Sequence, residues 1–365
     1  MRKLRKEIKY ILGTTVILIF SGCFSSYILN SKRINADFSK ISLKNIFFTV
    51  DEFPQIDPYL TMQLQDDGYD IYVPSSNGYR YGPSIIYYDD GTMDAWFASN
   101  GNNKEWDWIT YRHFDGNDWL DEEIVLKPTK KSLDKYSTCD PGVIYFGGYY
   151  YIGYTSTINA TNGGVENNVF VARSEKPNGK YEKWNGEGWG GNPKPMIEYT
   201  DNDLNWGAGE PSFVIVGDKL YCYYSLINSE GSFTKLAIAD LSENWPETLV
   251  DSGIAIIRKN NQDSFDVLYN DDTQSFLAFS IENRLNDKSS IALYESSDGM
   301  RFDQIDTIKG IQKNAHNMGI SKKPNGHISL NDDLLIGYAY SKDRKPVWGR
   351  WSTRFHSIKL KYMSK

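Results

Sequence analysis

The chain has 365 residues and a formal net charge of −7, and 15% of its residues are aromatic. A length of this order suits one large domain or two small ones, and the acidic balance excludes the basic face that nucleic-acid binding requires. Aromatic side chains fit the pleated surface of β-sheets, so the composition indicates a β-rich globular protein.

Residues 1–31 have the composition of a targeting segment. The first nine positions hold five basic residues, and the next 22 residues, from 10 to 31, carry no charge. A basic start followed by an apolar run is typical of an export signal. Phe20–Cys23 (FSGC) resembles a bacterial lipobox, in which Cys23 is lipidated. An uncleaved membrane anchor, for which about 20 apolar residues suffice, and simple secretion are the alternatives. All three place the domain outside the cytoplasm.

Residues 32–75 are expected to form a tether and a strand that leads into the main domain. Ile46–Val50 (IFFTV) has the composition of a strand, whereas prolines at 54, 58 and 74 break the rest of the segment.

From residue 76 onward the chain repeats one pattern. An apolar strand, a polar turn and an aromatic-rich strand recur in five stretches: 81–99, 139–157, 209–225, 265–280 and 319–341. An alternating strand and an outer strand complete each unit, which is a hairpin pattern. Such units predict propeller blades. We therefore expect an all-β, five-bladed β-propeller over residues 76–365, with Arg354–Met363 as its last outer strand.

One residue stands at the head of each inner strand in the first four stretches: Gly82, Asp140, Glu210 and Asp266. An acid there can simply accept turn hydrogen bonds. Three acids at one repeat position instead indicate a shared site, because equivalent strand heads converge on the propeller axis. Carboxylates that lie close together raise one another's pKa, and burial adds to that rise. Glycoside hydrolysis uses such a group: one carboxyl protonates the leaving oxygen and another activates water or attacks.

Glu210 is the predicted acid, because its side chain is longer and the segment Trp206–Pro211 (WGAGEP) sets aromatic and small residues beside it. Asp140 is expected to tune the proton of Glu210 and to bind a substrate hydroxyl. Trp206 is the predicted platform on which a sugar ring stacks. The expected partner is a carbohydrate.

The stretches CDPGVIYFGGYYYIGYTS and GEPSFVIVGDKLYCYYS make residues 76–362 resemble the five-bladed propeller glycosidases of family 43, a group of β-xylosidases, α-L-arabinofuranosidases and arabinanases. In that family an aspartate base heads blade one, a pKa-modulating aspartate heads blade two and a glutamate acid heads blade three. The resemblance thus implies Asp140 as modulator and Glu210 as acid. Gly82 occupies the base position, and glycine cannot activate water. Asp266 is the predicted replacement.

The resemblance also suggests substrate-binding residues. The family often carries a histidine on blade five near a central ion, and His316 is similar in placement. Asn317 beside it and Arg80, just before the blade-one head, are predicted to contact substrate. A Ca²⁺ or Na⁺ ion at the axis is an open possibility, and such an ion would need mostly oxygen ligands. No Cys/His spacing for zinc occurs, and no other cofactor is expected.

Two functions of different classes follow from these residues. The first is an extracytoplasmic glycoside hydrolase that acts on a polysaccharide or oligosaccharide by carboxylate acid/base catalysis. The second, motivated by Gly82, is a glycan-binding surface lipoprotein that has lost turnover. A sugar transferase or phosphorylase is a third option, for which Arg80 supplies an anion site.

Overall fold

The computed structural model describes residues 59–363, except 75–77, 103, 202 and 347. The segment 1–31 with Cys23, and the predicted strand Ile46–Val50, lie outside these residues. The described part consists of β-strands and two short 3₁₀-helices, η4 (Thr161–Gly163) and η5 (Trp245–Thr248). Its helices are all too short to cross a membrane.

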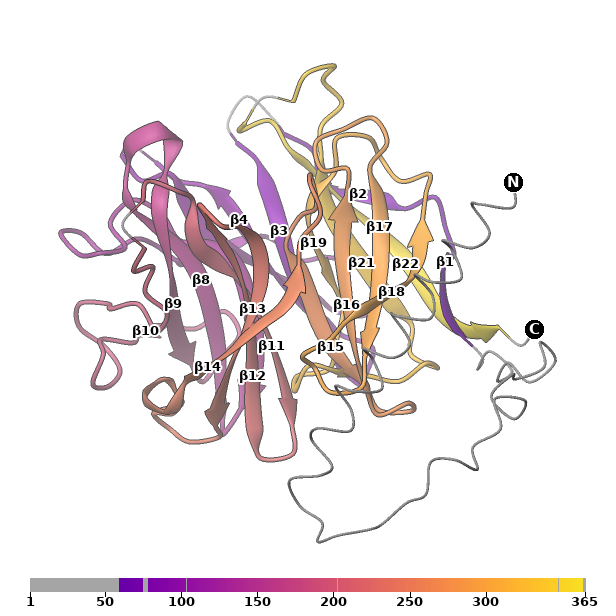
Figure 1. Ribbon diagram of the computed structural model, residues 1–365. Coiled ribbons are helices and arrows are strands. Elements are labelled where there is room, and N and C mark those ends of the chain that lie inside the picture. Colours follow the sequence, from indigo (N-terminus) through magenta and orange to yellow (C-terminus); the bar gives the residue numbers. More distant parts are fainter. Residues whose placement is uncertain (1–58, 75–77, 103, 202, 347, 364–365) are drawn as a thin grey trace, which may run out of the picture. The chain divides into compact units, whose positions relative to one another are not determined.

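Antiparallel sheets form five blades, and Figure 1 shows the inner strands toward the middle of the domain. The first three blades consist, from inside outward, of β3 (Arg80–Tyr87), β4 (Met93–Asn100), β5 (Asp107–Phe114) and β6 (Glu123–Leu126); of β7 (Cys139–Phe146), β8 (Tyr149–Asn159), β9 (Val165–Ser174) and β10 (Glu182–Lys183); and of β11 (Gly207–Val216), β12 (Lys219–Asn228), β13 (Gly231–Asp240) and β14 (Val250–Ile257). The last two blades consist of β15 (Phe265–Asn270), β16 (Ser275–Glu282), β17 (Ser290–Ser296) and β18 (Asp303–Ile308); and of β19 (His316–Ile320), β21 (Leu334–Tyr340), β22 (Ser352–Met363) and β1 (Tyr59–Leu64). The predicted all-β, five-bladed propeller is confirmed.

Blade five combines both ends of the described chain. β22, which we expected to be the last outer strand, pairs with β21 on one side and with β1 on the other. The outermost strand is therefore β1, from the range 32–75 that was assigned to a tether and leading strand. β2 (Tyr69–Tyr72) also pairs with β22. The short strand β20 (His327–Ile328) leaves blade five and pairs in parallel with β15 of blade four.

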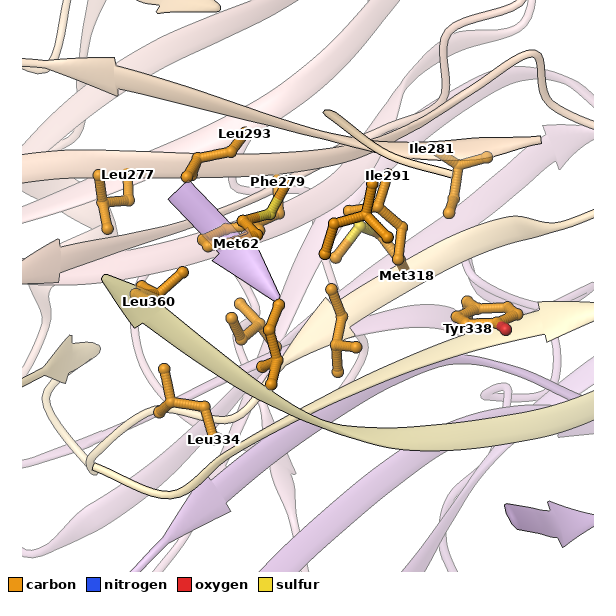
Figure 2. Packing of buried hydrophobic residues seen from close by; sticks show 14 of the residues in the cluster. Met62, Leu277, Phe279, Ile281, Ile291, Leu293, Met318, Leu334, Tyr338 and Leu360 are labelled. Atoms are coloured by element: carbon orange, nitrogen blue, oxygen red, sulfur yellow. The ribbon is translucent and has the colours of Figure 1, made fainter. Parts of the chain in front are cut away.

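The interfaces between blades form the core. Figure 2 shows Met62 of β1 and Leu360 of β22 among side chains of blade four such as Leu277 and Leu293. Because each inner strand is covered by neighbouring blades, both of its faces are buried; every residue of β19 is an example. Such strands read as continuous apolar runs instead of alternating ones. This packing holds the strand heads rigidly around the axis.

Candidate functional site

Four of the five inner strands begin with the same backbone irregularity. Gly82, Asp140, Glu210 and Asn317 all have a left-handed backbone, with φ of 57°, 49°, 53° and 40°. The ladder to the next strand shifts register at each of these heads. A bulge of this kind re-aims the side chain that it carries. The repeated bulge therefore directs one residue from each of blades one, two, three and five toward the axis.

Blade four departs from this pattern, and Asp266 does not stand at the head of its strand as predicted. The ladder from β15 to β16 runs without a shift, with Asp266 opposite Phe279. Around the axis, the triplet Ser264-Phe265-Asp266 matches Gly82-Pro83-Ser84 and the corresponding triplets of blades two and three. The head of blade four is thus Ser264. Asp266 is two residues further along the inner strand, and thus about 7 Å deeper in the central channel that the five inner strands surround.

Asp266 is occupied there by other groups. Its Oδ1 accepts hydrogen bonds from Ser212 Oγ (2.7 Å) and Lys322 Nζ (2.8 Å), and its Oδ2 accepts one from the Ile320 amide (2.9 Å). The Lys322 side chain is only 1% exposed. An ammonium group therefore holds the carboxylate in the channel. The described residues contain no group of three acids, histidines or cysteines that could ligate a metal. Around Asp266 itself, the Lys322 ammonium occupies the place beside the carboxylate that a cation would take.

The structure brings Asp140 and Glu210 together on the propeller axis, at the floor of the cavity that is described below and that we call the funnel. The Asn317 amide nitrogen lies 3.4 Å from Asp140 Oδ1 and 3.2 Å from Glu210 Oε1 and donates to both. Asn317 was predicted to contact substrate; here it bridges the two predicted catalytic carboxyls. A single NH₂ group within reach of both acids places them in one small volume.

Glu210 is the carboxyl that receives positive charge. Ser225 Oγ donates to Glu210 Oε2 (2.6 Å), and Arg258 Nη1 donates to Ser225 Oγ (2.9 Å). Arg258 Nη1 is also 3.7 Å from Glu210 Oε2, and the Arg258 side chain is 3% exposed. The nearly buried guanidinium therefore contacts Glu210 both directly and through the Ser225 hydroxyl.

Asp140 has the opposite environment. Burial, followed by the negative charge of Glu210, raises the pKa of Asp140 well above its ordinary value, although a hydrogen bond from Thr155 opposes this rise. Two coupled carboxyls of this kind titrate as a pair. At neutral pH Asp140 therefore keeps its proton.

His316 positions Asn317 and does not line the cavity. Its ring is fully buried against Trp351, with 4.0 Å between centroids, and its Nδ1 is 2.6 Å from Asn317 Oδ1. Burial and the charge of Arg284 lower the pKa of His316 to about 4, so the imidazole is neutral. For Nδ1 to bond a carbonyl oxygen it must carry the proton. That bond fixes the amide of Asn317 with its NH₂ toward the acids.

Above this floor lies a cavity of about 750 Å³ with aromatic walls. The ring of Trp206 crosses Gly209, where a Cβ atom would lie 2.6 Å from Trp206 Cη2. Only glycine permits this approach, which puts the predicted stacking residue beside Glu210. Trp106, Tyr79, Tyr81 and Trp348 line other parts of the wall. The cavity has the size and lining of a small-molecule site.

Arg80, in contrast, is outside this cavity, so the structure does not bring it together with the other predicted site residues. Its guanidinium pairs with Glu122, donates to Asn100 Oδ1 (3.0 Å) and lies 4.7 Å from the centre of the Tyr72 ring. Successive residues of a strand point to opposite faces. Tyr81 therefore faces the funnel and Arg80 faces away from it.

Two groups in the funnel were missed by sequence reasoning. Asp107, at the start of β5, is 6% exposed and lines the cavity with Asp140 and Glu210. Arg284 follows β16, lines the same cavity and is paired with the fully buried Asp263 at 3.3 Å. Burial is the largest influence on the pKa of Asp263 and raises it, but the charges of Arg284 and Arg258 and the hydrogen bond from the Asn317 amide act with His316 to hold that pKa below its ordinary value. One feature of the sequence could have identified Asp107 as a site residue: it lies between two tryptophans at the start of a strand (WDW, 106–108).

Comparisons with known proteins agree with this fold. No protein-family model matches the sequence, and no curated protein is significantly similar to it. Among solved structures, a family 117 glycoside hydrolase from Zobellia galactanivorans superposes with a TM-score of 0.59 at 12% identity, over 83% of this chain and 90% of that one. An α-L-arabinofuranosidase from Podospora anserina in complex with cellotriose gives 0.56 at 11%, over 83% and 97%. A thermostable family 43 glycoside hydrolase gives 0.54 at 14%, over 81% and 93%. The fold is that of the family 43, 62 and 117 propellers.

Proposed function

We propose that this protein is a glycoside hydrolase whose proton donor is the carboxyl pair Asp140 and Glu210. The observation that carries the proposal is the position of both acids at equivalent bulged strand heads, bridged by the Asn317 amide at the floor of an aromatic cavity. Propellers of this shape that are described as glycoside hydrolases support it. Nothing in blade packing requires two buried acids at this place.

In the proposed mechanism the pair supplies one proton to the glycosidic oxygen. Trp206 stacks on the sugar ring beside Glu210, and Glu210 contacts the leaving oxygen. Arg258 lies close to Glu210, and Asp140 holds a proton in the free protein. Transfer of this proton between the two carboxyls, which share the Asn317 amide through Oδ1 and Oε1, makes Glu210 the donor when substrate excludes water. Raising the proton affinity of an acid in a water-excluded site is how carboxyls act as donors near neutral pH.

The charges in the cavity favour a neutral sugar. Among the described residues that line it are three acids, Asp107, Asp140 and Glu210, and one cationic side chain, Arg284. Arg284 is already paired with Asp263. A uronic acid or a sugar phosphate would add negative charge to an acidic wall without a free cation to receive it, whereas neutral sugars offer hydroxyls that carboxylates bind.

Hydrolysis is tested with the purified protein on aryl α-L-arabinofuranosides, β-D-xylosides and β-D-galactosides, and on oligosaccharides of arabinan, xylan and galactan. The expected result is release of sugar, detected by chromatography. Saturable binding of these oligosaccharides with no product would instead support the second candidate, a glycan-binding protein. Gly82 at the family's base position is the observation that favours that alternative.

The pH profile should report the shared proton. Because the pair must be protonated to act, kcat/KM is expected to fall as pH rises through the raised pKa of Asp140. Asp140→Asn removes the like charge beside Glu210. That variant should be slower, and its alkaline limb should move to lower pH. An alkaline limb at the same pH in Asp140→Asn would contradict the shared proton.

We also propose that the domain is exported and carried on a lipid at Cys23. The support is the basic, then uncharged, N-terminal sequence ending in FSGC. Expression in a bacterial host with labelled palmitate should label the intact protein and leave Cys23→Ser unlabelled. Equal labelling of both proteins, or of neither, would refute lipidation at this residue.

A further inference from the structure

The ring of strand heads contains no group that can accept a proton from water on the far side of the sugar. Gly82, Ser264 and Asn317 accompany the acid pair, and none of them is a base near neutral pH. Hydrolysis by either stereochemical route needs a second carboxylate, as base or as nucleophile, separate from the donor. The funnel wall supplies one that lies outside the ring.

Asp107 is that carboxylate, and its backbone is held firmly. It opens β5 in the same blade as Gly82. The Thr138 amide donates to its carbonyl oxygen (2.9 Å), and the amide of the preceding Trp106 donates to Tyr136 O (2.7 Å). These bonds tie the start of β5 to the segment that leads into β7, the strand that carries Asp140. Asp107 and Asp140 are thus fixed relative to each other on neighbouring elements.

The side chain of Asp107 is held but keeps its charge near neutral pH. The Tyr79 hydroxyl donates to Oδ1 at 2.6 Å. Burial raises the pKa of Asp107 to about 6, while hydrogen bonds from Tyr79 and Tyr81 limit the rise. The other titratable groups that face it are Cys139 and Asp140 of β7. A carboxylate with such an affinity for protons is ionised at pH 7 and is a stronger base than an exposed aspartate.

We propose that Asp107 is the general base that replaces the acid absent at Gly82; this assignment rests on the proposed hydrolase function. In the step, the water oxygen bonds to the anomeric carbon as the bond from that carbon to the leaving oxygen breaks. The Asp140–Glu210 pair gives its proton to the leaving oxygen, and Asp107 takes a proton from the attacking water. Afterwards Asp107 returns this proton to solvent and the pair regains one.

Gly82 offers an independent way to test the same role. A Cβ atom built on it would be 3.8 Å from Asn317 Cβ and 3.9 Å from Asp140 Oδ1, which are ordinary van der Waals distances. Its φ of 57° is shared by the non-glycine heads Asp140 and Glu210, and aspartate is among the residues that best tolerate this conformation. Gly82→Asp would therefore return a carboxylate to the floor of the funnel.

The experiment compares four variants on whichever aryl arabinofuranoside, xyloside or galactoside the wild-type protein hydrolyses fastest. Asp107→Asn should lower kcat by about 10²–10⁴-fold and abolish the acidic limb of kcat/KM near pH 6. Tyr79→Phe removes a bond to the ionised form and should move that limb to higher pH. Adding Gly82→Asp to Asp107→Asn should restore at least a tenth of the lost rate. Glu210→Gln is the fourth variant and tests the acid.

The outcomes separate this proposal from the one on which it rests. If Glu210→Gln removes hydrolysis of oligosaccharides but Asp107→Asn keeps the wild-type kcat, Asp107 is not the base. An Asp107→Asn effect confined to KM, with an unchanged acidic limb, also overturns the role, because it would mark a group that only binds sugar. If the wild-type protein releases no sugar from any substrate, the hydrolase function itself fails. Thermal unfolding of each variant confirms that losses of rate are not losses of fold.

Discussion

Glu210→Gln should abolish turnover of oligosaccharides, with kcat about 10²–10⁴-fold below wild type. Glutamine keeps the size of the side chain, although its single amide oxygen replaces the two oxygens that accept from Ser225 and Asn317. It can neither hold nor deliver the proton. The loss should depend on the leaving group. A dinitrophenyl glycoside releases a stable anion that needs no proton, so the variant should retain far more of its activity on that substrate.

Glu230→Gln is the matched control, because Glu230 is an exposed glutamate in the turn between β12 and β13. It should behave as wild type on both substrates. An equal loss in Glu210→Gln on oligosaccharide and dinitrophenyl glycoside would contradict an acid role and would leave Glu210 only a binding residue.

Lys322→Met should produce the largest loss of stability. The Lys322 ammonium lies 2.8 Å from Asp266 Oδ1 inside the channel, with side chains 1% and 12% exposed. Removing one partner of a buried ion pair leaves the other charge without compensation and costs about 3–5 kcal/mol of unfolding free energy. In a domain of this size that loss corresponds to a melting temperature lower by about 10 °C.

The neighbouring Lys323 provides the control, since its side chain is 32% exposed and its nitrogen is 3.8 Å from Asp332. Lys323→Met should change the melting temperature by little, because exposed ion pairs contribute about 0–1 kcal/mol. Adding Asp266→Asn to Lys322→Met removes the stranded charge and should recover part of the loss. A Lys322→Met protein as stable as Lys323→Met would show that the channel pair contributes little to stability.

The sequence was sufficient for the repeat and for two of the acids. Asp140 and Glu210 each precede a proline, as Gly82 does, and all three of these heads carry the bulge. The bulge at Asn317 occurs without a proline. Blade four has no proline at its head, and its ladder runs without a shift. The apolar pattern alone therefore aligned Asp266 with the other heads, two residues beyond Ser264.

The other differences arise from contacts that a repeat does not encode. β1 pairs with β22 across about 300 residues of chain, as in Leu60 with Tyr362, and the sequence of a single edge strand does not specify its partner. Asp107 reaches the funnel from a third strand, whose distance from the axis depends on how blade one packs against blade two. Arg80 is adjacent to Tyr81, whose side chain faces the funnel. Because side chains alternate between the two faces of a strand, this difference of one residue directs Arg80 away from the funnel.

The central claim is that Asp140 and Glu210 share one proton at neutral pH, and infrared difference spectroscopy of the carboxyl C=O stretch tests it most directly. A pH titration of the wild-type protein should show one carboxyl that stays protonated above the pH at which exposed acids, and then Asp107, ionise. That signal should be absent from Asp140→Asn, and in Glu210→Gln it should disappear at a lower pH than in the wild-type protein, because burial still raises the pKa of Asp140 after the charge of Glu210 is removed. Full ionisation of all carboxyls at neutral pH in the wild-type protein, or the same signal persisting in Asp140→Asn, would contradict the account.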